Sequence, residues 1–127
     1  MTRLLVIAGS LLAALSAAAQ AAGEDEAARR ALAAHDYDQV IRVYSSAEAS
    51  AKPLTDMARY RLAIAHSKTQ NPIAAWNQLQ QALELNPKGT FASTPARLAD
   101  LQASITAACE SIGKPGCRQG VSSFSVQ

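Results

Sequence analysis

Glycine, aromatic residues and cysteine are all scarce in this chain of 127 residues. No glycine occurs between Glu24 and Lys88, aromatic residues make up 5% of the sequence, and there are two cysteines. The formal net charge of +2 excludes a strongly basic nucleic-acid binder, and we expect no nucleic-acid partner. The hydrophobic content of 49% excludes an intrinsically disordered chain.

Sequence patterns of catalytic sites are also missing. The chain has no Gly-x-Ser-x-Gly motif, no phosphate-binding loop and no His-Glu-x-x-His motif. Its two histidines, His35 and His66, are isolated, so surface or packing roles explain them better than metal binding or base catalysis. We therefore expect a protein that is not an enzyme, with no catalytic residues, no metal and no cofactor.

What the chain has in abundance is alanine, at 28 positions, and part of it belongs to an N-terminal export signal. Met1-Thr2-Arg3 forms a short positive segment, an apolar run extends over residues 4–15, and Ala19-Gln20-Ala21 offers a cleavage site. This pattern predicts a secretory signal peptide over residues 1–21 and a periplasmic or secreted protein without stable membrane insertion. An uncleaved anchor or a buried helix is the alternative.

Helix start and stop signals divide the rest of the chain. Asp36 followed by Gln39, then Thr55, Asn71-Pro72 and Thr94-Pro95 are typical N-cap patterns, and Gly113 is typical of a helix end. Strand signals are nearly absent, so the class is all-α. We expect five helices in one domain over residues 22–112, followed by a tail over residues 113–127.

An internal repeat links two of these helices. Residues 35–47 align with residues 70–82 at an offset of 35, which pairs Val40 with Ala75 and Ala47 with Ala82. The second unit ends in Leu83-Glu84-Leu85-Asn86-Pro87. Two helix-turn-helix units of this length predict a repeat architecture.

The pattern resembles the tetratricopeptide repeat (TPR), a helix-turn-helix unit of about 34 residues. The matching positions are Ala28, Val40, Tyr44 and Ala47 in the first unit, and Leu62, Ala63, Ala75, Ala82 and Pro87 in the second. His66, Leu79 and Ala27 depart from the family pattern. The resemblance implies a TPR-like α-α superhelix of two repeats over about residues 21–89, with the fifth helix as a C-terminal capping helix. Such stacks normally need three repeats, so the fifth helix, a homodimer or both should cover the open face.

The resemblance also implies a ligand groove lined by the first helix of each repeat, with the fifth helix extending the surface. Carried over to this chain, the candidates for binding a partner are Arg29, Tyr60, Ile64 and Lys68, with the arginine, tyrosine and lysine facing outward. Ile64 stands where some relatives use an asparagine to hold a peptide's carboxylate, so that clamp is not matched. We expect an adaptor that binds a peptide or protein. The alternatives are a self-associating structural envelope protein and an accessory or neutralising partner of an envelope enzyme or toxin.

The two cysteines lie on either side of the expected helix end. In an oxidising compartment Cys109 and Cys117 are expected to form a disulfide that pins the tail to the fifth helix. Two free thiols or an intermolecular bridge are the alternatives. The spacing is not that of a Cys-x-x-Cys redox motif.

Overall fold

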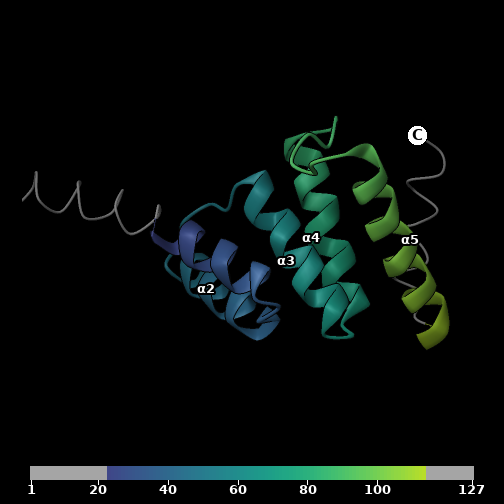
Figure 1. Cartoon of the computed structure of the whole chain (residues 1–127), viewed down its shortest axis with the longest axis horizontal. Helices are drawn as coiled ribbons and strands as arrows, with labels where there is room; N and C mark the ends of the chain where they lie inside the picture. Colours follow the sequence, from purple (N-terminus) through teal and green to yellow (C-terminus); the bar gives the residue numbers. More distant parts are fainter. Residues whose placement is uncertain (1–22, 114–127) are drawn as a thin grey trace, which may run out of the picture.

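The computed structural model describes residues 23–113, and every regular element within that range is an α-helix (Figure 1). Residues 23–33 form the first helix. The others are α2 (Tyr37–Ala49), α3 (Asp56–Lys68), α4 (Pro72–Leu85) and α5 (Pro95–Ile112). The all-α class is confirmed. The expected signal peptide at residues 1–21 lies outside the described residues, as does almost all of the expected tail at residues 113–127.

α2, α3, α4 and α5 start at the N-caps that the sequence predicts, and α5 ends at the predicted glycine. The side chains of Asp36, Thr55, Asn71 and Thr94 accept a hydrogen bond from the backbone N–H three residues later, at 3.1–3.5 Å. α5 ends at Gly113, which adopts the left-handed conformation with φ of 64°. These bonds satisfy backbone donors that a helix leaves without partners, so they fix where each helix starts.

Three of the connections between helices share one backbone geometry. Between α2 and α3, Ala51 has φ of 58°, and the N–H of Lys52 donates to the carbonyl of Ala47, five residues earlier, at 3.2 Å. In the other two connections, the residue after the turn also caps the next helix. His35 and Gln70 have φ of 60° and 61°, in the left-handed region. The N–H groups of the next residues, Asp36 and Asn71, each donate to the carbonyl five residues earlier at 2.8 Å. The turn after residues 23–33 and the turn after α3 therefore reverse the chain in the same way, at positions 35 residues apart.

The helices follow one another in space in chain order (Figure 1). α3 lies between two clusters of buried side chains. Ala58, Leu62 and Ala65 join a cluster formed with residues 23–33 and α2. Tyr60 and Ala63 join a second cluster formed with α4, α5 and the loop between them. Because α3 has apolar partners on both sides, its sequence lacks the single apolar stripe of a surface helix.

Alanine supplies the close contacts of both clusters. Ala28, Ala63, Ala65, Ala75 and Ala82 are each 0% exposed. A small side chain at such a position lets neighbouring helices pack closely, and the interior stays dense without many bulky residues. The alanine-rich composition is thus consistent with a well-packed helical domain.

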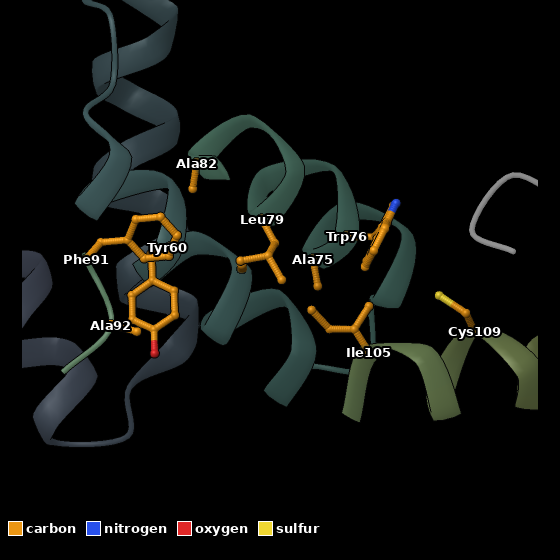
Figure 2. Close-up of a cluster of buried hydrophobic side chains, with 10 residues drawn as sticks. Tyr60, Ala75, Trp76, Leu79, Ala82, Phe91, Ala92, Ile105 and Cys109 are labelled. Carbon is orange, nitrogen blue, oxygen red and sulfur yellow. The ribbon is translucent and has the colours of Figure 1, made fainter. Parts of the chain in front are cut away.

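α5 covers the open face of α3 and α4. Its Ile105, 0% exposed, packs against Leu79 and Ala75 of α4 in the second cluster (Figure 2). Farther along α5, Ile112 remains 47% exposed. Within residues 23–113, no helix is both long enough and apolar enough to cross a membrane.

Candidate functional site

A groove with a volume of about 500 Å³ runs between α3 and α5. From α3 it is lined by Tyr60, Ile64, Ser67 and Lys68, and from α5 by Arg97, Asp100, Leu101, Ser104 and Ala108. We call this hollow the α3–α5 groove. It combines half-buried apolar side chains with exposed charged ones, the usual composition of a site that binds a partner.

The structure brings three of the four predicted partner-binding residues together. Tyr60, Ile64 and Lys68 lie at intervals of four residues along α3, so they share one face of the helix and all line the groove. Arg29 is not among the lining residues. Its guanidinium instead pairs with the carboxylate of Glu26, at 2.6 Å and 3.0 Å, on the helix of residues 23–33. The hydrogen bonds from Arg29 lower the pKa of Glu26 to about 2.

Tyr60 does not face outward as the sequence analysis expects. The side chain is 9% exposed, and its ring lies 4.9 Å from that of Phe91, measured between centroids (Figure 2). Phe91 belongs to the loop between α4 and α5, which the helix pattern leaves without a core role. Because this loop folds back over α3, Tyr60 becomes part of the core and forms the floor of one end of the groove.

The two walls of the groove run in the same direction. The Nδ2 of Asn86, at the end of α4, donates to the Oδ2 of Asp56 at 3.0 Å, so the loop leading to α5 starts beside the beginning of α3. Arg97, in the first turn of α5, then lies near Tyr60. Burial raises the pKa of the Tyr60 hydroxyl, and the positive charge of Arg97 partly offsets that rise. Arg97 therefore marks the end of the groove nearest the start of both helices.

Lys68 marks the opposite end. It follows Tyr60 by eight residues (68 − 60), and eight residues at 1.5 Å each place it about 12 Å farther along α3. Ile64 lies midway on the same face, across from the half-buried Leu101 of α5. The groove thus has apolar side chains at its middle, beside Ser67, Asp100 and Ser104, and one cation near each end.

The ionic groups of the groove have no ionic partners within the described chain. Lys68, Arg97 and Asp100 are exposed, and none of them forms a salt bridge with another described residue. The two arginines of α3, in contrast, lie close to acidic side chains. Arg59 contacts Glu48 at 3.5 Å, and Arg61 lies 3.8 Å from Asp25. The charges that hold the helices together are paired, whereas those of the groove face solvent.

Sequence reasoning expected the fifth helix to extend the binding surface but named none of its residues. Arg97, Asp100 and Ser104 follow one another at intervals of three and four residues, which places them on one helix face. That spacing is visible in the sequence. What it cannot show is that the face lies opposite Ile64 and Lys68, because this depends on the path of the loop over residues 86–94.

A second hollow, with a volume of about 610 Å³, lies between residues 23–33 and α2. Its polar groups already have partners: Lys52 contacts Glu24 at 3.7 Å, and Arg42 donates to the Oε1 of Gln39 at 2.9 Å. Partnered groups must lose those contacts to bind something else, so this hollow is the weaker candidate.

Only some of the residues that could bind a metal or form a disulfide lie in the described part of the chain. In the described part of the chain, no three side chains of His, Cys, Asp or Glu gather where they could hold a metal ion. Cys109 is 2% exposed in the last turns of α5, packed in the second cluster. Cys117 lies outside the described residues, so the Cys109–Cys117 disulfide stays a prediction.

Comparison with known proteins adds no relative. No family model, no curated protein and no solved structure matches the chain. The functional assignment therefore depends on the geometry of the chain's own residues.

Proposed function

We propose that this chain is a non-catalytic TPR-like interaction module, an adaptor that binds a peptide or protein partner in the α3–α5 groove. The location that we propose, periplasmic or secreted, depends on the signal peptide expected over residues 1–21. Two features of the helical domain support the TPR-like part of the proposal, and the groove supports the binding part.

The first support is burial at the positions that match the repeat pattern. Eight of these positions and the departing Leu79 face helix contacts. The exposed fraction is 0% for Ala28, Val40, Ala63, Ala75, Leu79 and Ala82, 2% for Leu62 and Tyr44, and 3% for Ala47. Burial at these positions is what the repeat pattern requires, because its small and apolar residues are the ones at which the helices pack. Pro87, the remaining match, lies in the exposed turn after α4.

The second support is the combination of turn and cap at His35 and Gln70. Both positions are followed directly by a capping side chain, Asp36 or Asn71, that accepts from the backbone three residues on. The α2–α3 connection has the same turn at Ala51, but the cap of α3 follows only at Thr55. Two helix-turn-helix units with equivalent turns and caps at a spacing of 35 residues fit a repeat. α5 then occupies the place of the capping helix.

The observation that carries the binding function is that side chains of α3 and α5 line one groove. Tyr60, Ile64 and Lys68 face Arg97 and Leu101 across a hollow whose charged groups have no ionic partners among described residues. Helix grooves of this kind bind extended or helical peptides through apolar contacts and flanking charges.

A peptide selection tests this function. A display library of random 12-residue peptides is selected on the purified chain, and the affinity of the enriched peptides is measured by fluorescence anisotropy. Ser104→Trp puts a bulky ring into the groove from its exposed α5 wall, and we expect it to reduce affinity at least tenfold. Ser45→Trp, at an exposed position of α2 away from the groove, is the matched control and should bind as the unmodified chain does. Equal binding by both variants would refute the groove as the binding site.

A further inference from the structure

We propose that the α3–α5 groove selects peptides with two acidic residues separated by apolar ones, so that one carboxylate binds Arg97 and the other binds Lys68. This inference rests on the proposed function and adds the chemistry of the ligand. Three features support it: the positions of Lys68 and Arg97, the surface between them, and Asp100, the acid beside Arg97.

The two cations are available to a ligand. Of the nine lysines and arginines between residues 23 and 113, five form salt bridges with described residues; the other four are Arg42, Lys68, Lys88 and Arg97. Two of those four, Lys68 and Arg97, line the same groove. An unpaired cation beside an apolar surface attracts carboxylates and strengthens binding when the two are brought together.

The distance between the cations sets the spacing of the acids. Arg97 lies near Tyr60, and Lys68 follows Tyr60 along α3 by about 12 Å, or eight residues at 1.5 Å each. An extended peptide advances about 3.3 Å per residue, so its two acids are about four residues apart. A helical peptide covers the same distance in about eight residues, which also places both acids on one face.

The surface between the cations includes apolar side chains beside the polar Ser67, Asp100 and Ser104. Ile64 and Leu101 are half-buried and pack against the second cluster, and Ala108 borders the Lys68 half of the groove. Burying medium-sized apolar side chains here removes nonpolar surface from water on both partners. The residues between the two acids should therefore be apolar, such as leucine, isoleucine or valine.

Asp100 argues against ligands that are acidic throughout. It is exposed on the same wall, one helical turn after Arg97, and forms no salt bridge with a described residue. A polyanion laid along the groove would bring negative charge against this carboxylate. Two separated acids avoid it, and a basic residue beside the acid at the Arg97 end would pair with it.

Charge reversal tests the inference. The 12-residue display library is selected on the unmodified chain, on the double variant Lys68→Glu/Arg97→Glu and on the control Lys88→Glu, which reverses an exposed lysine outside the groove. All three positions are exposed, so the helices should persist, which circular dichroism checks. The unmodified chain and the control should enrich acidic residues at two positions around apolar ones, and the double variant should enrich lysine and arginine there.

Synthetic peptides give the second measurement. In an enriched peptide capped at both ends, replacing either acid by its amide should lower the affinity about two- to fivefold, the range for exposed ion pairs. The inference is overturned if enriched peptides lose affinity on Ser104→Trp yet show no acidic preference, or if charge reversal leaves the selection unchanged. Peptides that bind Ser104→Trp normally would instead refute the proposed function itself.

Discussion

His35 and Gln70 each directly precede the capping residue of a helix and share a left-handed backbone, with φ of 60° and 61°. Residues with a side chain adopt this conformation at a cost of about 1–2 kcal/mol each, because Cβ approaches the following carbonyl. Both turns are nonetheless built without glycine. A glycine substitution at either position should therefore recover part of that stability.

Gln70→Gly should raise the free energy of unfolding by about 0.5–1 kcal/mol. Glycine removes the strain of the left-handed conformation, and the greater freedom of the unfolded chain offsets part of that gain. The Gln70 side chain is exposed and makes no hydrogen bond with a described residue, so little else is lost. Urea unfolding measures the difference. Ala103→Gly, at an exposed position inside α5, is the control and should lower stability by about 1 kcal/mol.

Tyr44→Phe should lower the free energy of unfolding by about 1–2 kcal/mol. The Tyr44 hydroxyl donates to the Oδ1 of Asp25 at 3.0 Å and accepts from the Nη1 of Arg61 at 3.0 Å, linking three helices at a side chain only 2% exposed. Tyr37→Phe removes a hydroxyl that contacts the exposed His35 and should lower stability by about 0.5 kcal/mol or less. Equal losses of stability in the two variants would show that the buried hydrogen bonds of Tyr44 contribute no more than the exposed contact of Tyr37.

Gly89→Ala should destabilise the chain by about 1–2 kcal/mol. Gly89 has φ of +66°, and a Cβ there would lie 2.6 Å from the Cδ2 of Leu98, which must move aside. This loop positions α5, so the substitution should also weaken peptide binding in the α3–α5 groove. Gly23→Ala, where an added Cβ meets nothing within 4 Å, should leave the melting temperature unchanged or slightly higher.

Stability should fall as the pH is lowered from about 7 to about 5, in part because of His66. Burial lowers the pKa of His66 below its ordinary value of 6.5. The unfolded chain therefore takes up a proton at a higher pH than the folded chain, and it is favoured as the pH falls below about 6.5. His66→Gln should reduce this slope in urea unfolding measured at a series of pH values. An unchanged slope would contradict the effect of burial on His66.

The helix boundaries could be predicted because their causes are local. Asp36, Thr55, Asn71 and Thr94 cap helices through bonds to the backbone three residues away, and Gly113 ends α5 by its own conformation. Such signals need no knowledge of distant contacts. The burial of Phe91 against Tyr60 could not be predicted from local signals, because it depends on how the loop over residues 86–94 returns to α3.

Only residues of the α3 wall of the groove could be predicted from the sequence. Tyr60, Ile64 and Lys68 share a face by helical spacing alone, but nothing local shows that Tyr60 is covered by Phe91 or that Arg97 lies near it. The prediction for Arg29 placed it with them, whereas its guanidinium pairs with Glu26 one turn earlier. Contacts between separate helices decide the site, and they follow from tertiary packing.

The most direct test of the central claim is to map peptide binding onto the chain by nuclear magnetic resonance. An enriched 12-residue peptide is titrated into the ¹⁵N-labelled chain, and the amide shift of each residue is followed. The account predicts that the largest changes lie on both walls of the α3–α5 groove, around Ile64, Ser67, Leu101 and Ser104. Changes confined to α2 and residues 23–33, with α3 and α5 unaffected, would contradict it.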